Sequence, residues 1–320
     1  MKKVAIIGAG FVGLAAAFHL ASKSAKVTVF DKVGVGGGAS GVASGLLHPF
    51  PGLSSHPPWM AFEGMQEANN LLNFFDSSIA SRRGILKIAV TPRQKKAFYR
   101  LSLNCKDATW LSPSSYCSLI DGPLKFPALY IKSGVTVDSV PYLNGIWKLC
   151  YQMGCKFERK KVFISDLGEF DDIVVAAGAG INRFSEANFS DLKYTKGQVL
   201  ICERPKNLVH SLSLIGRGYL ALIPNSTKCT LGATYEESYE SKRPCLETAK
   251  KRISYKSKEL FSLSSFKISS CLAGIRVKDQ ASSRPRIIKK GKAIFITALG
   301  SRGLLYHGYL GKQVAKEIIG

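Results

Sequence analysis

Three glycines near the start of the chain have the spacing of a loop that binds phosphates. Gly8, Gly10 and Gly13 form the pattern G-x-G-x-x-G within Gly8-Ala9-Gly10-Phe11-Val12-Gly13. The first glycine permits a tight turn, the second lets the backbone approach a pyrophosphate, and the third lets a helix pack closely on a strand. A helix beginning here would present free N–H groups and its positive dipole end to the phosphates. The pattern predicts a dinucleotide-binding turn.

An acidic residue completes this predicted site. Residues 4–7 read as an apolar strand, residues 11–20 have helical spacing, and residues 26–31 read as a second strand that ends in Asp31. A carboxylate at that strand end can accept hydrogen bonds from ribose hydroxyls. The segment therefore predicts a βαβ unit with a right-handed crossover. The alternative is a glycine-rich turn that holds no ligand.

A second glycine-rich turn follows an apolar strand predicted over residues 170–178, but it lacks the third small residue. In Gly178-Ala179-Gly180-Ile181-Asn182-Arg183, an arginine stands where glycine or alanine is needed. So large a side chain would hold helix and strand apart. The sequence therefore predicts one bound dinucleotide rather than two.

The remaining elements must position these turns. Helical periodicity predicts helices over residues 59–75, 143–153, 246–260 and 304–319. Residues 34–52 read as irregular, and residues 194–245 as mainly β, with a late strand over residues 293–297. Residues 76–130 read as short strands with turns at Thr91-Pro92 and Asp121-Gly122-Pro123. Because parallel-sheet pieces lie at the start, middle and end, two interleaved domains are expected.

Composition favours a soluble globular chain. The 320 residues are 46% hydrophobic, which excludes disorder, collagen and coiled coil as the main architecture. The eight cysteines form no C-x-x-C pair and no zinc pattern, so reduced thiols in a cytoplasmic protein and no metal are expected. Lys2, Lys3 and the apolar run after them imitate a secretory signal, but the glycine spacing argues against one. No other stretch could span a bilayer, so membrane association is not indicated.

Several short blocks, spread in order over essentially the whole chain, resemble the D-amino-acid oxidase superfamily of FAD-dependent amine oxidoreductases, to which glycine oxidase belongs. They are the N-terminal glycine turn and residues 38–41, 45–49, 196–199, 274–276 and 299–304. Residues 38–49 and 300–304 are most similar to the FAD-dependent oxidase half of the bifunctional enzyme that modifies wobble uridine in tRNA.

The resemblance implies an α/β fold in which a Rossmann-like, FAD-binding domain with a parallel sheet is interleaved with an antiparallel-sheet substrate domain. The FAD-binding domain is expected over residues 1–75, 131–193 and 271–320. The substrate domain is expected over residues 76–130 and 194–270. The flavin ring is expected to lie between them.

The resemblance also implies which residues hold FAD. Ala39 and Ser40 match small residues near the pyrophosphate and the ring. Residues 300–303 match a turn where N–H groups and a helix dipole stabilise negative charge on reduced flavin, although an ordinary turn before a helix is the alternative. The expected set is Gly8, Ala9, Gly10, Phe11, Val12, Gly13, Asp31, Lys32, Ala39, Ser40, Leu46, Leu47, Val162, Ala177, Gly178, Gly300, Ser301, Arg302, Gly303 and Leu304.

Three residues are candidates for a catalytic role. Arg276 matches the arginine that grips the substrate carboxylate in this superfamily, and a guanidinium fork suits that bidentate contact. His48 lies in a loop that passes near the flavin in relatives, where a neutral imidazole could take a proton from an ammonium substrate. Arg302 could direct its charge into the same region. The alternatives are a structural ion pair for Arg276, a packed loop histidine for His48, and a solvent-facing Arg302.

The segment after Arg276 departs from the family pattern. Relatives have a proline soon after the arginine and an acidic-x-x-Pro turn, whereas here Asp279 and Pro285 match only approximately. Carboxylate recognition is therefore less firmly expected than FAD binding.

Three functions remain open from the sequence. The first is oxidation of the C–N bond of a free small amino acid or secondary amine by hydride transfer to flavin N5. The second is the same chemistry on a carboxymethylaminomethyl-type wobble uridine in tRNA, and the third is a flavin- or RNA-binding protein without turnover. The net charge of +23 favours a polyanionic partner only if it is clustered. Candidate basic clusters are Arg82, Arg83, Arg93, Lys95, Lys96 and Arg100; Lys156, Arg159, Lys160 and Lys161; and Lys250, Lys251 and Arg252.

Overall fold

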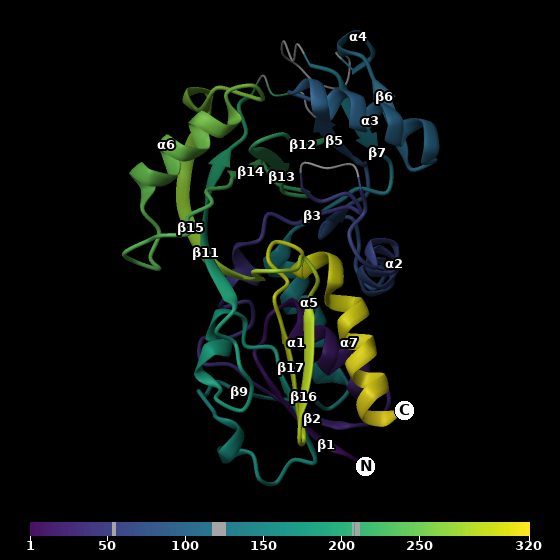
Figure 1. The fold of residues 1–320 in the computed structure, drawn as a ribbon, viewed down its shortest axis with the longest axis vertical. Coiled ribbons are helices and arrows are strands. Elements are labelled where there is room, and N and C mark those ends of the chain that lie inside the picture. The colour runs from purple at the N-terminus through teal and green to yellow at the C-terminus, as the bar shows by residue number, and fades with distance from the viewer. Residues whose placement is uncertain (53–55, 117–125, 207, 209–211) are drawn as a thin grey trace.

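The predicted βαβ unit forms the centre of a parallel sheet in the computed structural model, which describes residues 1–52, 56–116, 126–206, 208 and 212–320 (Figure 1). β1 (Lys3–Ile7) leads into α1 (Phe11–Ala21), and β2 (Lys26–Phe30) then lies parallel to β1. α1 is almost entirely buried because its Ala and Leu side chains pack into the main hydrophobic core. The predicted strand–helix–strand order and the parallel pairing of its strands are confirmed.

Strands from the start, middle and end of the chain meet in one six-stranded sheet, in the order β16-β17-β10-β1-β2-β9. The added strands are β9 (Lys156–Glu158), β10 (Asp172–Val175), β16 (Arg286–Lys290) and β17 (Ala293–Thr297). All neighbours are parallel except β16, which pairs antiparallel with β17 at the edge. The expected Rossmann-like sheet is therefore present.

Helices pack beside this sheet and position its loops. α1 contacts α5 (Ser139–Gln152) and α7 (Gly303–Ile319), and α7 also contacts α2 (Ala61–Leu72) (Figure 1). These helices confirm three of the predicted ones. α5 begins four residues earlier than predicted, because Pro141 lies in its first turn, where proline fits a helix.

A second, eight-stranded sheet has the order β15-β11-β14-β13-β12-β5-β7-β6. Its strands are β5 (Ile85–Ile88), β6 (Ala108–Leu111), β7 (Ala128–Ile131), β11 (Leu192–Glu203), β12 (Ser213–Ile215), β13 (Tyr219–Leu222), β14 (Lys228–Gly232) and β15 (Lys267–Asp279). Neighbours are antiparallel except β12 and β5, which are parallel. The predicted antiparallel sheet is confirmed, and its parallel pair joins strands too distant in sequence for a hairpin to connect them.

The domain boundaries stay a prediction. The boundary predicted between residues 270 and 271 falls inside β15. This strand begins at Lys267 and pairs along its length with β11 of the second sheet.

The region between residues 76 and 130 contains a helix that the sequence analysis missed. The turn predicted at Thr91-Pro92 is wrong, because Thr91 caps α3 (Pro92–Asn104). Thr91 Oγ1 accepts a hydrogen bond from Gln94 N at 3.2 Å, and Gln94 Oε1 accepts one from Thr91 N at 3.0 Å. This reciprocal pair is a capping box, readable from T-x-x-Q. α4 (Pro113–Tyr116) follows, and the turn predicted at 121–123 lies outside the described residues.

Of two other glycine-rich segments, the first is more regular than the sequence predicted. Within residues 34–52, Ala39–Val42 form a 3-10 helix, and β3 (Leu46–Leu47) joins a three-stranded sheet with β8 (Val135–Val137) and β4 (Ala80–Ser81). Gly178–Arg183 form a 3-10 helix rather than a second Rossmann helix. The predicted charged helix is α6 (Leu246–Ser257).

Candidate active site

Each glycine of the N-terminal turn is required by a close approach of other atoms. A Cβ at Gly13 would lie 1.8 Å from Gly8 O, which confirms the close packing of helix and strand that the pattern predicts. A Cβ at Gly8, whose φ is +112°, would lie 2.3 Å from Ala176 O. A Cβ at Gly10 would lie 2.8 Å from Ser40 Oγ. A side chain at these positions would therefore collide with the chain around the turn.

The carboxylate of Asp31 is bonded to the backbone of two neighbouring loops. Its Oδ2 accepts a hydrogen bond from Ala9 N at 3.0 Å, inside the glycine turn. Its Oδ1 accepts hydrogen bonds from Val33 N at 2.8 Å and Gly34 N at 3.2 Å. Asp31 thus fixes the turn relative to the end of β2. Its contact with a ribose stays a prediction.

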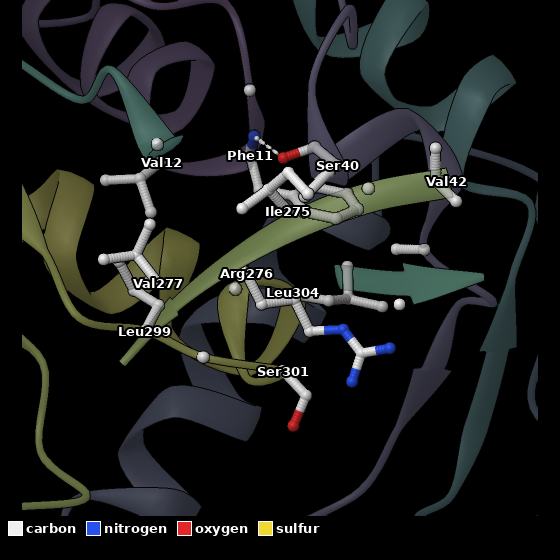
Figure 2. Close-up of a pocket in the computed structure, with 18 of the residues that line it drawn as sticks. Phe11, Val12, Ser40, Val42, Ile275, Arg276, Val277, Leu299, Ser301 and Leu304 are labelled. Carbon is white, nitrogen blue, oxygen red and sulfur yellow. Dashed lines mark hydrogen bonds between the residues drawn. The ribbon is translucent and has the colours of Figure 1, made fainter. Parts of the chain in front are cut away.

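Two helices begin at one pocket. Phe11 and Val12 of α1 and Gly303 and Leu304 of α7 all line it. Neither helix has an acidic residue in its first turn, so its own side chains leave the positive dipole end uncompensated. Figure 2 shows the hydrogen bond from Phe11 N to Ser40 Oγ, 3.1 Å long, at the edge of this space. The pocket therefore has two places that favour a negative charge.

The turn before α7 is held against β15. Ala298 and Gly300 have positive φ values of 64° and 57°, which reverse the chain after β17. Gly300 N donates a hydrogen bond to Val277 O at 2.7 Å, and Arg302 N donates one to Leu299 O at 2.9 Å. The neighbouring residue on β15, Arg276, therefore sits at a defined position relative to the start of α7.

Two polar side chains from different strands reach the pocket over glycines. The Arg276 guanidinium lies above Gly197 on β11, where a Cβ would be 1.9 Å from Nη2. The Tyr219 ring lies above Gly232 on β14, where a Cβ would be 2.3 Å from the hydroxyl oxygen. In the strand order β15-β11-β14-β13, Arg276 comes from β15 and Tyr219 from β13. Their side chains therefore extend toward each other over the two strands in between, β11 and β14. Figure 2 shows Arg276 extending from β15 past Leu304 and Ser301.

The Tyr219 hydroxyl is paired with a residue of the 34–52 segment. It accepts a hydrogen bond from Ser44 Oγ, and Ser44 also lines the pocket. Burial raises the pKa of Tyr219, so the phenol is protonated at neutral pH. Its hydroxyl can therefore serve as a donor as well as an acceptor.

The pocket is positively charged around Arg276. Arg276 Nη2 donates a long hydrogen bond to Thr234 O at 3.5 Å, and Lys256 Nζ donates one to the nearby Ala233 O at 3.2 Å. Burial, followed by the charges of Arg276 and Arg252, lowers the pKa of Lys256. In the part of the chain that the structure describes, no carboxylate forms an ion pair with Arg276.

A carboxylate close to Thr234 in the sequence is engaged elsewhere. Glu236, only 6% exposed, accepts hydrogen bonds from Gln198 Nε2 at 2.9 Å and Thr234 Oγ1 at 2.5 Å. These bonds hold the segment whose carbonyl oxygens face Arg276 and Lys256. An anionic ligand would therefore supply the charge that the chain itself does not place there.

The structure brings many of the predicted residues together at this pocket. Those that line it are Gly10, Phe11, Val12, Ala39, Ser40, Leu46, Gly178, Arg276, Gly300, Ser301, Gly303 and Leu304. They come from β15 of the second sheet, from the starts of α1 and α7, and from the turns and short elements between the two large sheets, which is where the sequence analysis expected the flavin.

His48 is not brought to the pocket lining. It is 6% exposed, its Nδ1 accepts a hydrogen bond from Phe50 N at 3.3 Å, and burial followed by the charge of Lys87 lowers its pKa to about 3. Lys87 Nζ donates to Phe50 O at 2.8 Å, and burial lowers the pKa of Lys87 to about 7. These contacts tie the 48–50 loop to β5, and they place His48 as a packed loop residue.

The other predicted residues also lie away from the lining. The Arg302 guanidinium donates a hydrogen bond to Ser283 O, which turns it toward the segment between β15 and β16. Lys32 is exposed, while Leu47 and Val162 are buried in hydrophobic cores. The turn residues that support the pocket from behind are Gly8, Ala9, Gly13, Asp31 and Ala177.

A buried tyrosine–histidine pair supports the pocket wall under Phe11. His307 Nδ1 lies 2.7 Å from Leu304 O, a carbonyl that can only accept, so this nitrogen carries the proton. His307 Nε2 then accepts a hydrogen bond from the Tyr142 hydroxyl at 2.7 Å. Burial lowers the pKa of His307 to about 4, so the ring is neutral. The pair packs against Phe11 and positions the start of α1.

The sequence analysis missed Tyr219, Ser44 and Lys256. Each lies far along the chain from Arg276, and no local pattern marks these positions. The glycines beneath Arg276 and Tyr219 were the available signal, because glycine inside a strand often marks close approach by other atoms.

The described residues offer neither a metal site nor a membrane-spanning helix. They contain no group of three or more His, Cys, Asp or Glu side chains that could hold a metal ion. No helix in the described segments has the length and apolar character needed to cross a membrane.

These residues fit the FAD that the sequence resemblance implies. The glycine turn leaves space at Gly10 that a side chain would fill, and the start of α1 adjoins that space. The start of α7 provides a second positive dipole end at the other side of the pocket. A cofactor with a pyrophosphate and an electron-rich ring matches these two ends.

Comparisons with known proteins agree with this geometry. One curated relative, glycine oxidase from Geobacillus kaustophilus (strain HTA426), is 29% identical over 106 residues, which is 30% of this chain and only 28% of that protein. The crystal structure of glycine oxidase from Geobacillus kaustophilus matches with a TM-score of 0.83 at 19% identity and covers 99% of this chain and 94% of that one. The structure of iminodiacetate oxidase from Chelativorans sp. BNC1 matches with a TM-score of 0.83 at 20% identity, covering 99% and 95%.

These structural matches support the α/β fold with two sheets. The profile of the family described as FAD dependent oxidoreductase matches residues 3–317, nearly the entire chain. The chain therefore belongs to the D-amino-acid oxidase family of FAD-dependent oxidoreductases.

Proposed function

We propose that this chain oxidises the C–N bond of a small amino acid or secondary amine that carries a carboxylate. The observation that carries the proposal is Arg276, a cation in the pocket that no carboxylate of the described residues neutralises. A substrate carboxylate would complete this pair through the guanidinium fork.

In this proposal the cofactor is held by the residues around the two helix starts. The N–H groups at the start of α1 would face the pyrophosphate, with Ala39 and Ser40 leaving space beside it. The start of α7, at Gly303, would stabilise negative charge on the reduced ring. FAD supplies the acceptor for a hydride from the carbon next to the substrate nitrogen.

The protein's own residues would orient the substrate and favour its reactive form. Arg276 would fix the carboxylate, and the Tyr219 hydroxyl lies where it could bond the same group or the nitrogen. Because Arg276 and Lys256 are both positive, their field lowers the pKa of a substrate ammonium group. The neutral amine, which can release a hydride, is therefore favoured without a dedicated base. His48 has no step in this scheme, because it does not line the pocket.

The names of similar proteins support the substrate class. One curated relative is a glycine oxidase and one structural neighbour is an iminodiacetate oxidase. Both names denote small amines that carry carboxylates, which agrees with the charge around Arg276.

Anaerobic reduction of the bound flavin tests this proposal. Glycine, N-methylglycine, proline and iminodiacetate would be compared with benzylamine, which lacks a carboxylate. We expect at least one carboxylated amine to bleach the flavin, and Arg276→Lys to retain flavin but lose that reaction. Unchanged turnover of carboxylated amines by Arg276→Lys would mean that Arg276 has another role.

The tRNA-borne substrate stays a prediction, as does a protein without turnover. Reduction by tRNA carrying carboxymethylaminomethyl-type uridine, with none by free amines, would support the first of these. Flavin that neither amines nor this tRNA reduce would support the second.

A further inference from the structure

The two chain segments that contain β5, α3, β6 and β7 have an unusual charge balance. Residues 77–116 and 126–137 contain nine Lys and Arg residues and a single carboxylate, Asp107, against 45 and 22 in the whole chain. Asp107 accepts hydrogen bonds from Ser133 N at 2.7 Å and Ser133 Oγ at 2.6 Å, so its charge is turned toward the chain. In Figure 1, α3 and β6 lie at the opposite end of the molecule from β1 and β2.

α3 presents part of this charge together with apolar side chains. Lys96, Tyr99, Arg100 and Leu103 have helical spacing that places them on one face, and all four are exposed. Phe98 packs on the other side of the helix and is fully buried. Because α3 is held by this core and by its capping box, the exposed face has a fixed shape.

A groove lies between α3 and the edge strand β6. It has a volume of about 620 Å³ and is lined by Tyr99, Leu103, Trp110, Lys106 and Lys132, with Ser102, Asn104 and Thr109 also contributing. The Tyr99 and Trp110 rings meet edge to face, with centroids 5.9 Å apart and planes at 80°. Tyr99 is still 49% exposed. We call these lining residues, together with Lys96 and Arg100, the α3 surface.

The structure places aromatic rings beside the basic cluster that contains Lys96 and Arg100. The sequence places Phe98 and Tyr99 between Lys96 and Arg100, but it does not tell which ring is exposed. The fold buries Phe98, exposes Tyr99 and adds Trp110 from β6. Cations that track phosphates beside aromatic rings that stack on bases are the two elements of single-strand recognition.

We propose that the α3 surface binds single-stranded nucleic acid. Lys96, Arg100 and Lys106 contact phosphates, and a base stacks on the exposed Tyr99 ring. The hydroxyl and amide groups of Ser102, Asn104 and Thr109 lie within the same groove and can bond base edges. An anionic membrane is a poorer match, because Leu103 is the single exposed aliphatic side chain among the lining residues of this concave surface.

In the other basic clusters, an aromatic ring is also present, but cations already lie over it; in the third, Lys258 Nζ lies 5.3 Å from the centroid of the exposed Tyr255 ring. Beside Lys160, the Phe163 ring is covered by Lys161 at 5.2 Å and Arg183 at 5.9 Å from its centroid. In the third cluster, Lys250 pairs with Glu247 at 3.2 Å. Lys160 therefore serves as a matched control for charge alone.

Fluorescence anisotropy with a fluorescein-labelled oligouridylate of about 12 nucleotides tests the proposal on the full FAD-loaded chain. We expect Tyr99→Ala to weaken binding by about 5- to 150-fold, the range for loss of one stacked base, and Tyr99→Phe to retain it. Lys96→Ala and Arg100→Ala should each reduce the slope of log affinity against log salt by about 0.7, the value for one single-strand phosphate. Lys160→Ala should leave both affinity and slope unchanged.

Three results would overturn the proposal. In the first, Tyr99→Ala binds the oligonucleotide like the wild type, or Lys160→Ala weakens binding as much as Lys96→Ala. Either outcome would indicate attraction by the overall positive charge rather than binding at the α3 surface. In the second, a duplex of the same length binds as tightly as the single strand. In the third, phosphatidylserine vesicles bind and the oligonucleotide does not. Because this surface is separate from Arg276, Tyr99→Ala should leave flavin reduction unchanged, so failure here is distinguishable from failure of the proposed oxidase activity.

Discussion

Replacing Gly197 by alanine should displace Arg276 without removing it. The new Cβ would lie 1.9 Å from Nη2 and 2.6 Å from Cζ of Arg276, so the guanidinium must retreat by about 1.5 to 2 Å to reach ordinary van der Waals contact. That displacement breaks a bidentate contact with a carboxylate, because such hydrogen bonds tolerate only a few tenths of an ångström. A hydrogen bond to a charged group contributes about 1.5 to 3 kcal/mol, so kcat/KM for the carboxylated amine should fall about 10- to 150-fold.

The assay is anaerobic flavin reduction by whichever carboxylated amine reduces the wild type fastest. Gly168→Ala is the matched control, because a Cβ there meets no heavy atom within 4 Å and its φ is not positive. Both variants should bind FAD like the wild type. In the Arg276→Met background, Gly197→Ala should have much less effect, since the two changes act on one contact. A wild-type rate for Gly197→Ala, or an equal loss in both backgrounds, would refute the assignment of Arg276 to the carboxylate.

Three further outcomes follow from contacts in the site and in the segments around it. Gly13→Ala should lower the free energy of unfolding by about 1 to 3 kcal/mol and weaken FAD binding, because its Cβ would lie 1.8 Å from Gly8 O; denaturant titration and flavin fluorescence measure the two effects. His48 has a folded pKa of about 3, below its value of 6.5 in the unfolded chain, so the unfolded state binds the extra proton and stability falls as pH drops from about 6.5 toward 3. His48→Asn should reduce the slope of that fall by about 1.4 kcal/mol per pH unit, and an unchanged slope in urea titrations would show that His48 is protonated in the folded protein. Tyr219→Phe should lower the free energy of unfolding by about 1 to 3 kcal/mol, because it leaves the Ser44 hydroxyl without its acceptor. Adding Ser44→Ala should recover part of that loss in a double-mutant cycle. Fully additive effects of the two substitutions would argue against the Ser44–Tyr219 hydrogen bond.

Local patterns predicted the parts of the fold that are local. The G-x-G-x-x-G turn, the strands beside it and most helices could be read from residues close in sequence, because turn geometry and burial impose short periods. The same kind of signal was present for α3 in Thr91 and Gln94, and reading Thr91-Pro92 as a turn overlooked that a cap and a first-turn proline also begin a helix.

The site itself depends on pairing between distant strands, which no local pattern encodes. Arg276 could be singled out by resemblance, but its neighbour Tyr219 comes from β13, and their approach depends on the order β15-β11-β14-β13. His48 differs from Arg276, because its place in the sequence suggested a catalytic role that the fold does not support. It is buried near Lys87 and packs within its loop. The resemblance identified candidate site residues such as Arg276. Their neighbours in space became visible only in the fold.

β15 joins the two halves of the pocket in one rigid piece of backbone. The strand carries Arg276 and, one residue later, accepts the hydrogen bond from Gly300 that anchors the start of α7. The distance between the guanidinium and the start of α7 is thereby fixed. We expect this fixed distance to select amines by the separation of their carboxylate from their reactive carbon. An elongated homologue such as β-alanine should therefore fit worse than glycine, however flexible the surrounding loops are.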